Sequence, residues 1–255
     1  MSKSLFIYGF HGIQAQLDAN PQNILKVSTL DNRQDKRLNT LIQQLDQHGI
    51  RVEKISKQKL ERLSGSRTHQ GVVAEVLLPT LPNHDELLNH ISKLDHPSLI
   101  LILDSIQDPR NLGACLRSAN AAGVDCVVIN KDGSAPVNAL VHKTSAGALN
   151  QLKVFSVTNL SRSIKALQKQ DIWIIGLDGS TDQSFYQIDL SSSIAIVMGT
   201  EGSGLRRLTK QSCDQLAMIP MKGNVESLNV SVATGIALFE TSRPTIIITQ
   251  KSFFW

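Results

Sequence analysis

The chain has 255 residues, of which 41% are hydrophobic and 19% are charged. This composition is typical of a globular protein with a sizeable core and excludes a disordered chain. No apolar run approaches the ~18 residues that a membrane helix needs, and the first residues lack the apolar core of a secretory signal, so we expect no membrane partner. Three cysteines form no CxxC pair, which indicates reduced thiols in a cytoplasmic protein: Cys115, Cys126 and Cys213. The seven histidines do not fall at metal-ligand spacing, so no metal site is predicted.

The formal net charge of +4 arises entirely in the first third of the chain. Residues 1–78 hold 11 Lys or Arg against 7 Asp or Glu, whereas residues 79–255 hold 15 of each kind. The densest basic stretch is 51–71, "RVEKISKQKLERLSGSRTHQG". A basic surface favours polyanions through phosphate neutralisation and counterion release. A solvated helix face has the same composition, and composition alone leaves both interpretations open.

The first 78 residues alternate short β-like runs with helical periodicity. The pattern predicts a small α/β domain with its own core. Pro79, Pro82 and Pro97 then punctuate the chain around one polar helix, so we expect a linker over 79–97. The expected strands of the small domain cover 5–8, 24–30, 51–56 and 71–78, and the expected helices cover 12–18 and 36–49.

From residue 98 onward, strands and helices alternate. Repeated β–α units predict a mostly parallel sheet with helices on both faces. Strands are expected over 98–104, 124–130, 172–177, 194–199 and 216–219, and helices over 111–123, 137–149, 159–170 and from 227 to Arg243, with Asn111 and Asn159 as N-caps. Residues 244–255, "PTIIITQKSFFW", do not fit this pattern. They could form an edge strand, a contact to a partner or a tail, so their role stays open.

Three loops follow strands of the predicted sheet and should open on one rim, because ligands bind at the carboxyl ends of parallel strands. They are "SIQDPRNLGACLR", "TEGSGLRRL" and "PMKGNVESLNVS". The second contains Gly199, Gly202 and Gly204, but neither GxGxxG nor GK[ST], so neither a dinucleotide fingerprint nor a P-loop is present. A tight turn explains one or two of these glycines, and close approach to a ligand explains all three. Glu201 has no packing purpose in such a turn.

The sequence does not show whether each arginine in these loops has a functional role or is simply solvated. Arg206 and Arg207 fit an exposed helix start. Arg117 lies away from the apolar stripe of its helix, where a solvated arginine is the commoner outcome, while Cys115 lies on the stripe and is expected in the core.

The segment 227–240, "SLNVSVATGIALFE", has no charge between Ser227 and Phe239, so it lacks an obvious solvent face. It nevertheless begins with several amide and hydroxyl groups. A capped core helix and a ligand site both account for this. We expect Ser231 and Thr234 only to bond nearby carbonyls.

Together, "DPRNLGACLRSANAAG", "IVMGTEGSGLRRL" and "IPMKGNVESLNVSVATGIALFE" resemble the three motifs of the SpoU/TrmH family, in order and spread over roughly 130 residues. These are RNA ribose 2′-O-methyltransferases of the SPOUT superfamily. "IYGFHGIQAQL" and "THQGVVAEV" resemble the small RNA-binding domain that precedes the catalytic domain in many members. The resemblance therefore covers nearly the whole chain. It extends to members that methylate a guanosine ribose in the 23S ribosomal RNA of the bacterial large subunit.

The resemblance implies a small RNA substrate-binding domain over 1–78 and a catalytic domain over 98–243 with a trefoil knot, dimeric through that domain. It also implies S-adenosyl-L-methionine as methyl donor, with S-adenosyl-L-homocysteine as product and no metal. The cofactor would be held by backbone at Gly199, Ile219 and Leu228 and enclosed by Met198, Thr200, Pro220 and Met221. The functional polar set would be Asn111, Arg117, Glu201, Ser227 and Asn229. The chain departs from the family pattern at Glu226, where a small polar residue is usual, and in its apolar extension after Arg243.

The family's usual candidate for removing the hydroxyl proton is Arg117, but a guanidinium stays protonated in proteins. We therefore favour Arg117 as a bidentate clamp on an RNA phosphate beside the target ribose. Asn111 and Asn229 both donate and accept hydrogen bonds, which suits them to hold a ribose edge.

Two alternatives stay open from the sequence. The same chemistry on transfer RNA is one, because no motif here selects the RNA. A non-catalytic RNA-binding or ribosome-assembly factor on a retained methyltransferase fold is the other. The complete polar set argues against it, because a binding module has no use for all five residues.

Overall fold

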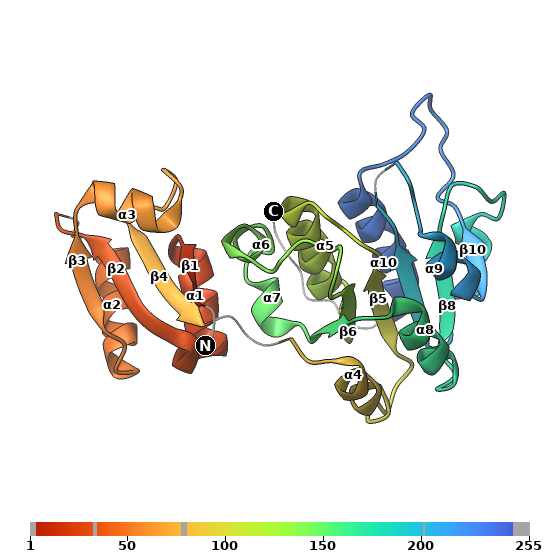
Figure 1. Cartoon of the computed structure of the whole chain (residues 1–255), viewed down its shortest axis with the longest axis horizontal. Helices are drawn as coiled ribbons and strands as arrows, with labels where there is room; N and C mark the ends of the chain where they lie inside the picture. Colours follow the sequence, from red (N-terminus) through yellow and green to blue (C-terminus); the bar gives the residue numbers. More distant parts are fainter. Residues whose placement is uncertain (1–3, 33–34, 78–80, 201, 247–255) are drawn as a thin grey trace. The chain divides into compact units, whose positions relative to one another are not determined.

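The computed structural model describes residues 4–32, 35–77, 81–200 and 202–246 (Figure 1). The chain divides into two compact units. The smaller is Met1–Thr80 together with Val137–Gln151, and the larger is Leu81–Pro136 together with Leu152–Trp255. Among the described residues, no helix is both long and apolar enough to cross a bilayer.

The smaller unit is built on a four-stranded sheet in the order β1-β4-β2-β3. β4 pairs antiparallel with both β1 and β2, whereas β3 runs parallel to β2. Apolar side chains from the sheet, α1 and α2 form one buried cluster, as expected for a domain with its own core. The elements are β1 (Ser4–Tyr8), α1 (Phe10–Ala19), a short 3₁₀ helix (Pro21–Asn23), β2 (Ile24–Leu30), α2 (Lys36–Gln47), β3 (Val52–Ile55), α3 (Lys57–Ser64) and β4 (Val72–Leu77).

The helix predicted over 137–149 is two short helices, α6 (Ala139–Thr144) and α7 (Ala148–Gln151). Between them, Ala146 and Gly147 have φ values of 50° and 92°, in the left-handed region. A helix cannot continue through such residues, so the single-helix prediction was wrong. In this unit α6 contacts β1 and α7 contacts α1.

The larger unit contains a six-stranded sheet in the order β10-β8-β9-β5-β6-β7, and every adjacent pair is parallel. The predicted parallel sheet is therefore confirmed, and five strands lie within two residues of their expected bounds. The sixth, β7, was missed because "VFSV" is too short to show a pattern. The strands are β5 (Leu99–Leu103), β6 (Cys126–Asn130), β7 (Val154–Val157), β8 (Trp173–Leu177), β9 (Ile194–Met198) and β10 (Gln215–Ala217).

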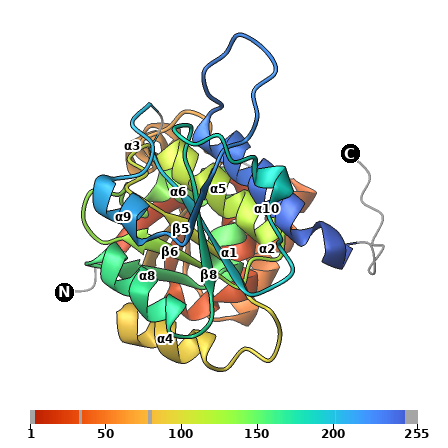
Figure 2. The ribbon, with the colours of Figure 1, turned by 90° about the vertical axis from the view of Figure 1, so that its right-hand side faces the viewer.

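Helices cover both faces of this sheet, which is why its central strands are continuous apolar runs (Figure 2). Ile100 and Ile102 of β5 pack into a core with α4 and α8, so Leu101 and Leu103 point to the other face. α4 (His84–Ile91), α8 (Leu160–Gln168) and α9 (Arg207–Ser212) lie on the first face, whereas α5 (Pro109–Ala121) and α10 (Val230–Ile246) lie on the second.

The segment expected as a linker, 79–97, contains the predicted polar helix, α4. A capping box between Asn83 and Glu86 starts this helix. Leu87 and Ile91 are buried in the core that also holds β5 and α8. This part of the segment is therefore packed onto the larger sheet.

The long helix α10 begins at Val230 and extends through Ile246, so the expected limits of Ser227 and Arg243 were both wrong by about one turn. Thr234 Oγ1 donates to the Val230 carbonyl over 2.7 Å, and Ser231 Oγ donates to Asn229 Oδ1 over 2.6 Å. Both hydroxyls thus bond nearby carbonyl oxygens, as expected. Residues 247–255, which make up most of the segment whose role the sequence leaves open, lie outside the described residues.

Candidate active site

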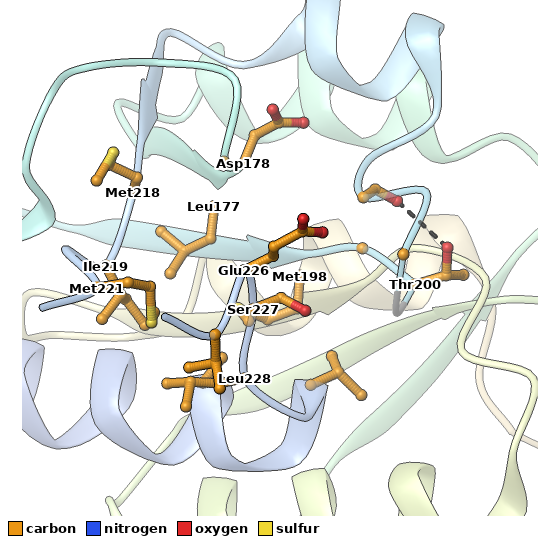
Figure 3. A pocket seen from close by; sticks show the side chains of 17 residues that line it. Leu177, Asp178, Met198, Thr200, Met218, Ile219, Met221, Glu226, Ser227 and Leu228 are labelled. Atoms are coloured by element: carbon orange, nitrogen blue, oxygen red, sulfur yellow. Dashed lines mark hydrogen bonds between the residues drawn. The ribbon is translucent and has the colours of Figure 1, made fainter. Parts of the chain in front are cut away.

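A cavity of about 540 Å³ opens at the carboxyl ends of β8, β9 and β10 (Figure 3). Its volume is in the range of small-molecule sites. Four stretches of chain line it: 177–179 at the end of β8, residues 198–200, 202 and 204 at and after the end of β9, residues 218, 219 and 221 after β10, and residues between 225 and 233 just before α10 and in its first turn. Two of the three loops expected to form a site therefore meet here.

The glycine loop that follows β9 is closed on itself. The backbone N–H groups of Thr200 and Gly204 each donate to the other's carbonyl over 3.0 Å. A Cβ at Gly199 would lie 2.2 Å from the carbonyl carbon of Gly204, so no other residue fits there. Gly202 and Gly204 have φ values of 81° and 65°, which L-residues rarely adopt. The turn thus accounts for all three glycines; Glu201 lies outside the described residues.

The structure gathers most of the predicted cofactor residues around this cavity. Pro220 does not line it, although its neighbours on both sides do. The predicted cofactor residues that line the cavity are Met198, Gly199, Thr200, Ile219, Met221 and Leu228. Ser227, from the predicted polar set, also lines it.

Asn111 and Asn229 form a direct polar contact between α5 and the entrance of α10. Asn229 Nδ2 donates to Asn111 Oδ1 over 3.1 Å. Asn229 Oδ1 accepts from the Ser231 N–H and hydroxyl, which fixes the orientation of the amide. The prediction that Asn111 caps α5 was wrong. Asp108 is the N-cap and Pro109 occupies the first helical position, which leaves the Asn111 amide available to Asn229.

Arg117 projects from α5 with an exposed side chain and has no ion-pair partner among the described residues. The helix that carries it is packed firmly on α10. Cys115 is buried, as predicted, and its Sγ lies 3.5 Å from Thr234 Oγ1, while a Cβ at Gly235 would lie 3.6 Å from Ser118 Oγ. Arg117 thus stands on a firmly packed helix, six residues after Asn111.

An ion pair between a buried carboxylate and a half-exposed arginine fixes the end of the glycine loop, and sequence reasoning missed it. Asp104 follows β5 directly and is fully buried. Its carboxylate accepts hydrogen bonds from Arg206 Nε, from the Arg206 backbone N–H over 3.0 Å and from Ser105 Oγ over 3.2 Å. Arg206 is therefore a structural partner of Asp104 rather than only an exposed helix residue.

Asp178 is a second carboxylate that the sequence reasoning missed. It follows β8, lines the cavity, and accepts from the Ser180 N–H and from Lys210 Nζ, each over 2.9 Å. Burial raises the pKa of Asp178, but the hydrogen bonds from Ser180 and Lys210 outweigh burial, so the pKa lies below its ordinary value. The rule that ligands bind at the carboxyl ends of parallel strands pointed to the other loops, and it applies equally to the end of β8.

Glu226, the departure from the family pattern, also lines the cavity. Its side chain is exposed and makes no hydrogen bond or ion pair with another described residue. No group of three or more His, Cys, Asp or Glu residues in the described part of the chain is placed to hold a metal ion.

Comparison with known proteins decides the family. Residues 98–239 match the SpoU rRNA Methylase family, and residues 6–81 match the RNA 2′-O ribose methyltransferase substrate-binding family. The chain belongs to the SpoU family. The first match includes the cavity and the asparagine pair, and the second covers the small sheet.

Relatives in the SpoU family match the chain over nearly its full length. The 23S rRNA (guanosine-2′-O-)-methyltransferase RlmB of Escherichia coli K12 is 46% identical over 94% of this chain and 98% of its own. RlmB of Coxiella burnetii is 48% identical over 95% of this chain and 97% of its own. The SpoU methyltransferase AviRb of Streptomyces viridochromogenes, solved with S-adenosylmethionine, has a TM-score of 0.80 at 21% identity, covering 96% of this chain and 91% of that one.

We predict that Asp104→Ala lowers the free energy of unfolding of the larger unit. The variant removes a buried carboxylate that accepts three hydrogen bonds, whereas the Arg206 guanidinium left behind is half exposed to water, so we expect a loss of about 1.5–3 kcal/mol. Urea denaturation measures this. Asp108→Ala is the matched control, because it removes an exposed N-cap carboxylate and should cost only about 1 kcal/mol. Equal losses in the two variants would contradict a stabilising role for the Asp104 carboxylate.

Proposed function

We propose that this chain transfers a methyl group from S-adenosylmethionine to the ribose 2′-hydroxyl of a guanosine in 23S ribosomal RNA. The observation that carries the proposal is the cavity closed by the glycine loop, with the asparagine pair joining the start of α5 to the entrance of α10. Similarity to RlmB over nearly the whole chain supports the choice of RNA.

The cavity fits the cofactor. The missing Cβ at Gly199 lets the Gly204 backbone close the loop, so Gly199 presents only main chain to the cavity, and apolar side chains at Ile219, Met221 and Leu228 suit a flat adenine ring and a methionyl chain. Met198, Thr200 and Pro220 belong to the same two stretches of chain. When bound, S-adenosylmethionine supplies the methyl group on its sulfonium.

The polar residues outside the cavity position the RNA. Asn229 is fixed by Ser231, so its amide holds Asn111, and together they orient the ribose hydroxyl for in-line transfer. Arg117 clamps a phosphate beside that ribose through its two parallel N–H donors. Ser227, at the rim of the cavity, and Glu201, in the glycine loop, complete the proposed set.

Residues 1–78 serve in this proposal as the RNA substrate-binding domain, 79–97 as the connecting segment and 98–243 as the catalytic domain. The match of 6–81 to a substrate-binding family supports this division. The six basic side chains of 51–71 are exposed, and none forms an ion pair with a described residue: Arg51, Lys54, Lys57, Lys59, Arg62 and Arg67. They are therefore accessible to phosphates.

The active form in this proposal is a cytoplasmic homodimer whose catalytic domain is threaded into a trefoil knot. An apolar stripe on α10 supports the dimer. Val232, Ile236 and Phe239 lie on one face of the helix, and the side chains of Val232 and Phe239 are 50% and 45% exposed, so this face is available to a second copy of the chain. A second copy packed there would bring another α5, and its arginine, close to the site.

The test of the function is mapping of ribose methylation in ribosomal and transfer RNA from cells that lack the protein. We expect one 23S guanosine to lose its methyl group, and the wild-type gene but not an Arg117→Ala variant to restore it. Unchanged ribosomal RNA with a missing methyl group in transfer RNA would redirect the proposal to that substrate. If methylation changed in neither RNA, the remaining interpretation would be a non-catalytic RNA-binding factor.

Gly199→Ala should weaken binding of S-adenosylmethionine by more than about tenfold, because the added Cβ overlaps the Gly204 backbone and displaces the loop. Isothermal titration calorimetry measures the affinity. Gly223→Ala is the control, since a Cβ there meets nothing within 4 Å. An unaltered affinity in the first variant would count against the cavity as the cofactor site.

Arg117→Lys should lower kcat/KM for RNA by about 100-fold, because a lysine cannot reproduce a bidentate phosphate clamp and misplaces the ribose. Cofactor affinity should not change. Steady-state methyl transfer and calorimetry separate the two effects. Nearly full activity with unchanged RNA affinity would exclude the clamp.

Replacing Lys54, Lys57 and Lys59 with alanine should weaken RNA binding. It should also reduce the slope of log K against log salt by about one unit for each lysine that neutralises a phosphate in the wild type. The control variant replaces three exposed basic residues of the larger unit, Arg162, Lys165 and Lys169. Binding measured between about 50 and 200 mM salt distinguishes the two variants. Equal slopes in both would argue against a special role for 51–71.

A further inference from the structure

The cavity contains a largely buried carboxylate for which the proposed reaction gives no role. Asp178 lies at the carboxyl end of β8, and only 9% of its side chain is exposed. Oδ1 accepts from the Ser180 N–H and from Lys210 Nζ, and Lys210 also donates to Ser180 Oγ. Two hydrogen bonds thus hold the carboxyl group, and the third holds its two donors together.

The second oxygen of this carboxylate is available to a ligand. Oδ2 accepts no hydrogen bond from any residue that the structure describes. It lies beside Gly204, where a Cβ would be only 3.3 Å away, so the glycine keeps the approach open. An ionised carboxylate oxygen on the wall of a cavity can accept a hydrogen bond from a bound ligand.

The carboxylate is ionised at neutral pH, because its pKa is lowered despite burial, so both oxygens can only accept. S-adenosylmethionine offers three kinds of donor: the ribose hydroxyls, the ammonium group and the adenine amino group. Of the apolar lining residues, Ile219, Met221 and Leu228 lie on the side of the cavity away from Asp178 (Figure 3). Adenine bound against these three side chains would leave the ribose to Asp178. A fixed carboxylate after a strand is the group with which other parallel α/β proteins bind a nucleoside ribose.

We propose that Asp178 Oδ2 accepts a hydrogen bond from a ribose hydroxyl of S-adenosylmethionine, with Lys210 and Ser180 as the residues that position it. This inference rests on the proposed cofactor. It adds a specificity residue for the nucleoside part of the ligand, from a loop outside the three family motifs.

The test combines one substitution with two altered ligands. Calorimetry gives the dissociation constants of S-adenosylmethionine and of its 2′-deoxy and 3′-deoxy analogues for the wild type and for Asp178→Asn. A hydrogen bond to a charged acceptor predicts that the substitution weakens S-adenosylmethionine binding about tenfold or more. One deoxy analogue should bind the wild type weaker by a similar factor and should lose little further affinity in the variant.

Glu226→Gln is the matched control, because it removes one negative charge from the same cavity at an exposed, unpartnered position. A general electrostatic effect would appear in both variants and would change S-adenosylmethionine and the deoxy analogues by the same factor. A directed hydrogen bond appears only in Asp178→Asn and only for the ligand with the hydroxyl.

Three outcomes overturn the inference. They are equal losses of affinity for S-adenosylmethionine and both analogues in Asp178→Asn, equal effects of the two substitutions, and a wild type that binds all three ligands within about twofold. The last comparison needs no variant, so it decides even where Asp178→Asn does not fold. Failure of the wild type to bind S-adenosylmethionine at all would instead contradict the proposed function.

Discussion

The buried carboxylate of Asp104 is the constraint on which the site depends. It ends the central strand β5 in a place without water, so it requires a cation and hydrogen-bond donors. Arg206 supplies both through its backbone N–H and its guanidinium. One ion pair therefore joins the middle of the sheet to the far end of the glycine loop. The near end is fixed as well, because the Asp104 N–H donates to the Met198 carbonyl of β9.

Between these two anchors the glycine loop has little freedom. Gly199 lies against the Gly204 backbone, so the loop closes on itself and presents main chain rather than side chains to the cavity. The opposite wall comes from the segment that leads into α10, and α10 is in turn packed on α5. The asparagine pair completes this arrangement, since it joins residues 118 positions apart. The shape of the cavity wall and the orientation of the two asparagine side chains thus depend on the same packing.

Features that depend on a continuous pattern could be predicted from the sequence. The apolar runs of β5 and β9 predicted a covered parallel sheet, and the carboxyl-end rule located two of the loops that line the cavity. Features that depend on a distant partner could not. Arg206 resembles any exposed helix start until Asp104 is placed beside it. Two errors instead passed over local signals. Asp108 and Pro109 are the usual residues at a helix start, so Asn111 was wrongly taken as the N-cap. Gly147 is a usual helix-stop residue, although Ala146 beside it favours a continuous helix. Asp178 follows β8, so the rule that ligands bind at the carboxyl ends of parallel strands could have identified it, but the sequence analysis missed it.

The order of these segments along the chain has a consequence for synthesis on the ribosome. β5 and α5 are made early, but the glycine loop, the 218–229 segment and α10 are all made after residue 198. A nascent chain that stops before α10 has all six strands of the larger sheet but lacks the helix that supports one wall of the cavity. It would also expose the apolar surface of α5 that α10 covers. Folding intermediates of this protein should therefore need protection from aggregation longest while the final helix is still emerging.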